Sequence, residues 1–164
     1  MASLALVTLL AASALVADPG QWPVKVQSVL TAGSTGYVEL RNISSTSVDL
    51  SGWTVRGCAG ATTVDLAELP AGAVLPGSER FLVAGADFAG PAARITVPAL
   101  VGDGLVLVDR RRARVDAVAT TPSSPCSERR AAAPCGALPL SRDPDGADTD
   151  DNSQDFHCAP PFGP

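Results

Sequence analysis

Hydrophobic and polar residues alternate along several short segments of the chain, and a period of two residues is typical of half-buried β-strands. In residues 37–42, Val38 and Leu40 point to one face while the residues around them point to the other. Comparable patterns predict further strands at residues 24–30, 53–58, 63–66, 80–84, 94–97, 100–109 and 115–118. No segment carries the i, i+3, i+4, i+7 stripe of an amphipathic helix, so the pattern predicts an all-β fold.

Turn residues separate these segments, in keeping with 15 glycines and 14 prolines. Pro76 and Gly77 have the residue types of a type II turn, with glycine at the position of positive φ. Residues 110–113 read Arg-Arg-Arg-Ala between two predicted strands, so a longer or bulged hairpin is expected there, because tight hairpin turns favour Asn-Gly or Asp-Gly. After Thr120 the alternation stops, and residues 121–164 are predicted to form a long irregular tail anchored by Leu138 and Leu140.

Three blocks of the sequence resemble the lamin tail domain family. Residues 37–55 combine a strand, an N-x-S turn and the run V-D-L-S-G-W-x-V. The elements around Pro76-Gly77 and the V-D-x-V strand at residues 115–118 are also similar to the family, and residues 142–156 resemble the R…G-x-D-T-D-D-N-x-x-D-F run of its secreted bacterial members. The resemblance implies an immunoglobulin-like β-sandwich with a long irregular C-terminal tail, and a non-enzymatic accessory or interaction role.

Length and composition fit one such domain. A chain of 164 residues is long enough for a self-sufficient core, since a domain of ~150 residues buries about 68–70% of its unfolded surface. Hydrophobic residues make up 46% of the sequence and aromatic residues only 4%, so the core is expected to be aliphatic, with Trp53 and Tyr37 inside it. We place the domain and its tail at residues 18–158 and expect residues 159–164 to be disordered.

The first residues have the character of a secretory signal peptide. Residues 4–16 are apolar but too few to span a bilayer, which takes ~20 residues, and Ala14 or Ala17 offers a cleavage point. No Lys or Arg precedes this stretch, which departs from the usual signal pattern. A buried first strand or helix is the alternative, although Asp18-Pro19-Gly20 separates the stretch from the strand predicted at residues 24–30. Residues 1–17 are therefore predicted to direct export, and the protein is expected to be secreted or extracellular without a transmembrane segment.

Four cysteines support an oxidising compartment. No C-x-x-C spacing is present, so a zinc site is not indicated. Four cysteines allow three pairings. We predict that one disulfide joins Cys126 to Cys135 and closes a local loop, and that the other joins Cys58 to Cys158 and ties the tail to the sandwich.

The acidic part of the tail is the most distinctive candidate site. Its carboxylate and amide oxygens are the ligands that Ca²⁺ prefers. The candidate residues are Asp143, Asp145, Asp148, Asp150, Asp151 and Asn152. The glycine of the D-P-D-G-A-D segment is not followed by the spacing and bidentate Glu of a calcium loop. The other interpretation is structural: the aspartates form Asx-turns, one of them pairs with Arg142, and Phe156 is buried.

Charge indicates the kind of partner. The formal net charge is −5, which disfavours nucleic acid because phosphate binding needs a basic surface. The basic exception is a patch predicted at the hairpin tip: Arg110, Arg111, Arg112 and Arg114. Such a run is typical of a solvated tip, and the sharper hypothesis is a docking point for an acidic partner.

The sequence offers little for catalysis. His157 is the only histidine, and its neighbour Cys158 is expected in a disulfide, which would remove the thiolate. No G-x-S-x-G, H-E-x-x-H or phosphate-binding glycine loop is present. We therefore expect a non-enzymatic extracellular module that binds a protein or cell-surface component and needs no cofactor. The alternative is a calcium-binding surface or adhesion protein that uses the acidic tail.

Overall fold

Strands account for almost all regular structure in residues 22–162, the part of the chain that the computed structural model describes. The predicted signal peptide, residues 1–17, lies outside this part. The strands are β1 (Val24–Leu30), β2 (Tyr37–Asn42), β3 (Val48–Asp49), β4 (Thr54–Ala59), β5 (Thr62–Glu68), β6 (Val74–Leu75), β7 (Arg80–Gly85), β8 (Ile95–Val97), β9 (Gly104–Val108), β10 (Arg114–Ala119), β11 (Leu140–Arg142) and β12 (Phe156–Cys158). One short helix, α1 (Asn152–Asp155), precedes β12.

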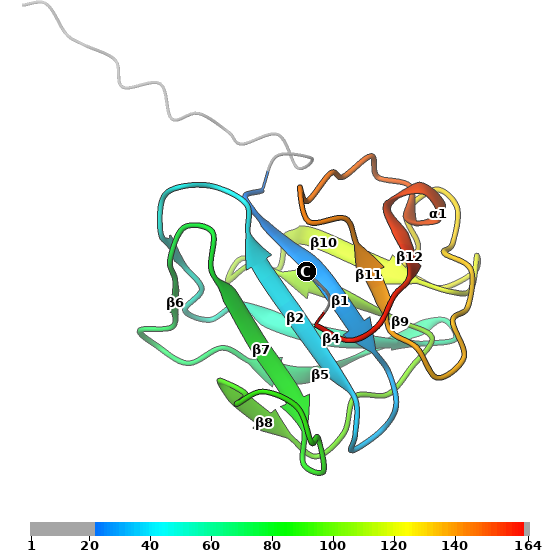
Figure 1. Cartoon of the computed structure of the whole chain (residues 1–164), viewed down its shortest axis with the longest axis horizontal. Helices are drawn as coiled ribbons and strands as arrows, with labels where there is room; N and C mark the ends of the chain where they lie inside the picture. The colour runs from blue at the N-terminus through cyan, green and yellow to red at the C-terminus, as the bar shows by residue number, and fades with distance from the viewer. Residues whose placement is uncertain (1–21, 163–164) are drawn as a thin grey trace, which may run out of the picture.

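The strands form two facing sheets and one short ribbon (Figure 1). The larger sheet has the order β12-β11-β1-β2-β7-β8, and the smaller has the order β10-β9-β4-β5. β3 and β6 make the two-stranded ribbon, and only β7 and β8 pair in parallel among the described strands. Every strand that the alternation predicted is present, with ends that differ by a few residues. The predicted all-β sandwich is confirmed.

The core between the sheets is aliphatic, as the composition predicted. Val38 and Leu40 of β2 are fully buried, and so are Leu105 and Leu107 of β9 on the opposite sheet. Trp53 lies at the margin of this core with 4% of its surface exposed, and Trp22 meets it edge to face at 5.6 Å. Burying one Leu or Val side chain stabilises the fold by ~1.5–3 kcal/mol. The inward-facing apolar side chains of the alternating strands therefore hold the two sheets together.

The disulfides pair differently from the prediction. The structure joins Cys58 to Cys126 and Cys135 to Cys158, so the predicted bonds Cys126–Cys135 and Cys58–Cys158 are wrong. Cys58 faces the outer side of the smaller sheet, where it packs with Cys126 against Val106 and Val108. The segment after β10 crosses this side and is fixed there. Because β12 pairs with β11, Cys158 comes close to Cys135 in the loop that precedes β11.

The tail adds strands to the larger sheet. β11 pairs antiparallel with β1, and β12 pairs antiparallel with β11. The irregular course predicted for residues 121–164 therefore holds for the loops but not for these two strands and α1. Leu140 and Phe156 are buried as anchors, whereas Leu138, the other expected anchor, is 47% exposed. The anchors are the tail residues that lie on strands.

The hairpin between β9 and β10 has the bulged connection that its arginines predicted. The register shifts between Arg114 and Asp116, and Arg112 adopts a positive φ of 65°. The carboxylate of Asp109 holds the tip, because its Oδ1 accepts hydrogen bonds from the backbone N–H groups of Arg111 and Ala113 at 2.8 Å each. A buried Asx-type turn thus replaces the glycine that a tighter hairpin would need.

Candidate functional site

A buried guanidinium lies where the tail meets both sheets. The side chain of Arg142 on β11 is fully buried, and its Nη2 donates to Asp116 Oδ1 on β10 at 2.9 Å. Its Nη1 lies 3.3 Å from Asp148 Oδ1 and 3.4 Å from Asp155 Oδ2. The guanidinium carbon also stands 4.4 Å from the centre of the Phe156 ring, within the range of a cation–π contact. One side chain therefore joins β11, β10, the acidic loop and α1.

Lys25 completes this group, which we call the buried charge cluster: Lys25, Asp116, Glu128, Arg142, Asp148 and Asp155. The Lys25 ammonium is 2.5 Å from Asp148 Oδ2, and both side chains are at least nine-tenths buried. Asp116 also accepts hydrogen bonds from the backbone N–H of Val26 at 2.6 Å and of Ala117 at 2.8 Å. Buried charges are stable only when paired in this way.

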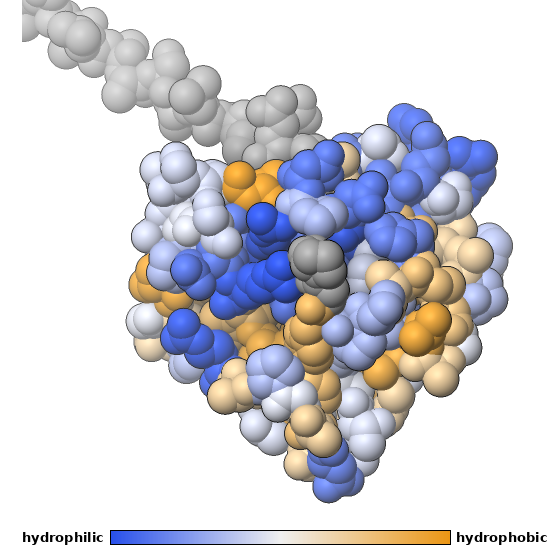
Figure 2. Space-filling model, viewed as in Figure 1, coloured by the Kyte–Doolittle hydropathy of each residue, from blue (hydrophilic) through white to orange (hydrophobic). Residues whose placement is uncertain are grey.

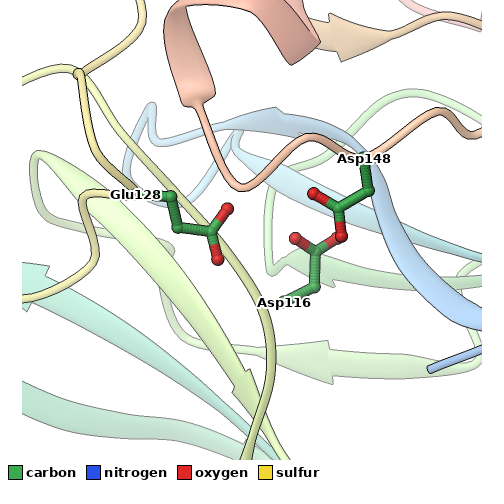
Figure 3. Close-up of side chains that lie close together, drawn as sticks. All are labelled: Asp116, Glu128 and Asp148. Atoms are coloured by element: carbon green, nitrogen blue, oxygen red, sulfur yellow. The ribbon is translucent and has the colours of Figure 1, made fainter. Parts of the chain in front are cut away.

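Three carboxylates of the cluster point toward one another (Figure 3). Ligand oxygens of Asp116, Glu128 and Asp148 lie within 4.8 Å of one another, a spacing that a metal ion could bridge. Each carboxylate already has donors, however. Glu128 Oε1 is 3.3 Å from Arg114 Nε, and its Oε2 accepts a hydrogen bond from Asn152 Nδ2 at 3.0 Å. The protein's own cations and amide therefore satisfy these oxygens.

Burial changes the proton affinity of the cluster. Desolvation raises the pKa of Glu128 to about 8, and the nearby Asp116 adds to the effect. Desolvation also raises the pKa of Asp116 to about 6, although Arg142 opposes the shift. Desolvation acts in the same direction on Asp148, but Lys25 and Arg142 together hold its pKa below the usual range. At neutral pH Glu128 is therefore largely protonated, while Asp148 is ionised.

The six residues predicted as calcium ligands have separate surroundings. Asp148 is the one member that belongs to the three-carboxylate grouping, which is the sole grouping of possible metal ligands found in residues 22–162. The Asp143 side chain is 74% exposed, and Asp150 is also exposed, with a positive φ of 55°. Asp145 Oδ1 accepts a hydrogen bond from the Ala147 N–H at 3.0 Å, as in an Asx-turn.

The last two predicted ligands hold α1 in place. Asp151 is its N-cap, accepts a hydrogen bond from the Ser153 N–H and pairs with Arg130 at 2.7 Å. Hydrogen bonds from Arg130 and Ser153 lower the pKa of Asp151 below its usual range. Asn152 Oδ1 accepts a hydrogen bond from the Ala119 N–H at 3.1 Å, so it binds the end of β10. At these positions the acidic run therefore binds the chain's own backbone N–H groups and an arginine.

The predicted arginine patch is divided among different contacts. Arg112 pairs with Asp65 of β5 at 3.0 Å, and Arg114 turns toward Glu128. Arg110 and Arg111 are exposed and border a surface cavity of about 340 Å³ beside Trp22. The four side chains therefore do not present one continuous basic surface.

His157 does not meet the geometry of a hydrolase. It stands opposite Ser141 in the β11–β12 pair, and its Nδ1 is 3.7 Å from Asp143 Oδ1, too far for a hydrogen bond. The Ser141 hydroxyl is instead 2.9 Å from the Ser28 hydroxyl, and Cys158 is in a disulfide. These groups lie close together, but His157 is not hydrogen-bonded to a nucleophile as a general base would be.

A recess that the sequence did not predict lies on the outer face of the larger sheet. We call it the outer-face recess. Its volume is about 380 Å³, and it is bordered by Gln27, Ser28, Glu39, Arg80, Ser141, Arg142, Pro144, His157, Ala159, Pro160 and Phe162. On this face, hydrophilic side chains gather over the upper parts of β1, β2 and β7 beside a hydrophobic band (Figure 2). A larger cavity of about 570 Å³ near Leu138 has mainly aliphatic and backbone walls and offers less specific chemistry.

Polar groups inside the outer-face recess are buried to an unusual degree. Glu39 is only 4% exposed, and desolvation raises its pKa although Arg80 lies 3.0 Å away. Gln27 is 6% exposed; its Nε2 donates to Arg142 O at 2.5 Å, while its Oε1 has no hydrogen-bond donor. The Ser28 hydroxyl is 2.9 Å from the Tyr37 hydroxyl. The recess therefore combines a carboxylate, a guanidinium, hydroxyl groups and an unpaired amide oxygen.

The alternation predicted which residues of β2 point outward, but it did not predict that these residues are buried. Gln27 lies in the irregularity of the β1–β2 register between Val26 and Ser28. A β-bulge changes the direction in which side chains point, and it is hard to recognise in a single sequence. The tail residues that border the recess come from more than a hundred positions further along the chain, so no local pattern could have placed them there.

Comparison with protein-family models gave no match, and a search among curated proteins found no similar sequence. No helix in residues 22–162 is long and apolar enough to cross a membrane.

Replacing Arg142 with Met should lower the free energy of unfolding by ~3–5 kcal/mol, because it leaves Asp116 and Asp148 buried without their common cation. The matched control is Arg56→Met, because Arg56 pairs with Asp65, whose side chain is 46% exposed. The free energy of unfolding of this variant should fall by at most ~1 kcal/mol. Urea unfolding followed by tryptophan fluorescence measures both. Equal, small losses would contradict the central role of Arg142.

Replacing Glu128 with Gln should remove a pH dependence of stability. An acid with a raised pKa in the folded state stabilises that state below its unfolded pKa, near 4.5, and loses this contribution as pH rises through about 8. The wild type should therefore lose ~2–3 kcal/mol between pH 6 and 8.5, whereas Glu128→Gln should stay nearly constant. Urea unfolding at several pH values measures this, with the exposed Glu68→Gln as control. A parallel decline in Glu128→Gln and wild type would refute the assignment.

Millimolar Ca²⁺ should leave the melting temperature unchanged relative to EDTA, because Lys25 and Arg142 already engage both oxygens of Asp148. A ligand at 100 times its Kd would stabilise the fold by ~2.7 kcal/mol, a shift of several degrees. Thermal unfolding with Mg²⁺ as control measures this. A Ca²⁺-specific rise that disappears in Asp148→Ala or Asp150→Ala would restore the calcium hypothesis.

Proposed function

We propose that the protein is an exported, non-enzymatic interaction module of lamin-tail type, and that it binds its partner at the outer-face recess. Two disulfides and the lack of a membrane-spanning helix in residues 22–162 fit an extracellular or at least non-membrane protein. The sequence resemblance supports the same role. The partner is a protein or a cell-surface component, since the net charge of −5 disfavours nucleic acid.

The single observation that carries this proposal is that Gln27, which borders a recess with a buried carboxylate, has an unpaired Oε1. Leaving a buried acceptor without a donor costs ~1–3 kcal/mol, and nearly all such groups in proteins are satisfied. The Nε2 assignment is fixed by two carbonyl acceptors, Arg142 O and Asp143 O, so exchanging the amide atoms would not remove the problem. A ligand that donates a hydrogen bond would supply what the chain does not.

Glu39 and Arg80 give the recess its specificity. The carboxylate is buried and the guanidinium is 40% exposed, so a polar ligand can reach the cation from solvent and approach the acid behind it. Concave sites with a few convergent polar groups and a perturbed pKa are typical of binding sites. The larger cavity near Leu138 does not combine these features.

The experiment measures binding of the fluorescently labelled, oxidised protein to intact cells of the source organism. Wild type should bind saturably, and Glu39→Gln should reduce binding at least tenfold because it removes the buried charge while keeping the shape. Glu68→Gln, the same change on an exposed edge of the smaller sheet, should bind like wild type.

Circular dichroism confirms that each variant is folded. Two results would overturn the proposal: no saturable binding by wild type, or equal binding by wild type and Glu39→Gln.

A further inference from the structure

We propose that the outer-face recess and the aromatic pocket beside it together bind an extended peptide segment with an aromatic side chain, and that Phe162 of the chain itself occupies the aromatic pocket as an intramolecular competitor. The inference rests on the proposed function, because it names the class of partner for the same site. The carrying observation is that the chain places one of its own aromatic residues against an aromatic pocket on the outward side of a sheet.

The aromatic pocket is built by two side chains that lie beneath Phe162. The ring of Phe162 stacks on Tyr37 with centroids 4.8 Å apart and planes at 28°, and it meets Phe88 edge to face at 5.8 Å. Tyr37 is 1% exposed although its side chain points away from the core between the sheets. Leu82 and Ala84 of β7 complete the apolar surroundings.

Residues 159–162 are held by few interactions. The disulfide of Cys158 fixes the start of the segment, and Ala159 N donates to Pro139 O at 3.3 Å. Pro160 and Pro161 have no N–H, and no hydrogen bond involves residues 160–162 within the described part of the chain. The segment crosses in front of β1 (Figure 1) and is held there mainly by the ring of Phe162. A segment with so few contacts opens at low cost.

The prolines also explain why the recess is only partly satisfied. Gln27 borders the recess and its Oε1 has no donor, and Pro160, which borders the same recess, has no N–H to provide one. A peptide with free N–H groups in place of these prolines has donors for Gln27 and for the carboxylate of Glu39. The chain's own segment is thus an incomplete ligand that a partner segment can displace. Aromatic-lined grooves of this kind recognise extended peptides in other proteins.

The test uses a protein that ends at Ala159 and the synthetic peptide Ala-Pro-Pro-Phe-Gly-Pro, which has the sequence of residues 159–164. Isothermal titration should show saturable binding to the shortened protein and at least tenfold weaker binding to the full chain, whose aromatic pocket is occupied by Phe162. The control peptide Ala-Pro-Pro-Ala-Gly-Pro should not bind. In the full chain, Phe162→Ala should restore binding, which keeps the test valid if the shortened protein is poorly folded.

Absence of binding to both the shortened protein and Phe162→Ala, with thermal unfolding showing that they are folded, would overturn the peptide site. Equal binding to the full chain would also overturn it, because the peptide would then lie elsewhere. Cell binding that depends on Glu39 together with no peptide binding would refute this inference alone. Peptide binding without any cell binding would support the peptide site and refute only the proposed extracellular partner.

Discussion

The tail depends on one buried interaction, the contact of the Arg142 guanidinium with carboxylates from three other segments. Its partners are Asp116 on β10, Asp148 in the acidic loop and Asp155 on α1. A charge of this kind is costly to bury, and the cost is offset only when every partner is in place. The cluster therefore defines one arrangement of the tail, since any displacement of β11 would leave several charges without partners.

The same strand that carries this constraint also helps to form the recess. Successive residues of a strand point to opposite faces, so burying Leu140 and Arg142 directs Ser141 outward. β11 then extends the larger sheet beyond β1, and β12 brings His157, which stands opposite Ser141, to the outer face. The register of β11 therefore places Arg142 in the buried charge cluster and Ser141 on the polar outer face.

The sequence predicted what depends on near neighbours and failed where distant residues decide. Alternation located the strands, and the arginines of the hairpin tip indicated a bulge. The disulfide pairing depends on which loop crosses which sheet, and no spacing of cysteines reveals that. The acidic run suggested calcium because its distant cation is invisible locally: Asp148 binds Lys25, 123 residues away. The turn after β6 shows the same limit. Ser78, not Gly77, has the positive φ, and the glycine at position 77 is instead required by space, since a Cβ there would lie 2.4 Å from the Ser45 backbone.

The outward polarity of the larger sheet therefore needs an explanation other than solubility. Solvent would satisfy Glu39 and Gln27 if they were exposed, yet the tail covers both and leaves one acceptor unpaired. The buried charge cluster shows that this chain pairs buried charges with partners from distant parts of the sequence. Three buried side-chain atoms in residues 22–162 lack a hydrogen-bond partner, Gln27 Oε1, Arg41 Nε and Ser127 Oγ, and of these residues only Gln27 borders the recess. Gln27 is thus the residue with an unpaired buried atom that stands beside a buried carboxylate and a partly exposed guanidinium, which is the arrangement on which the proposed binding site rests.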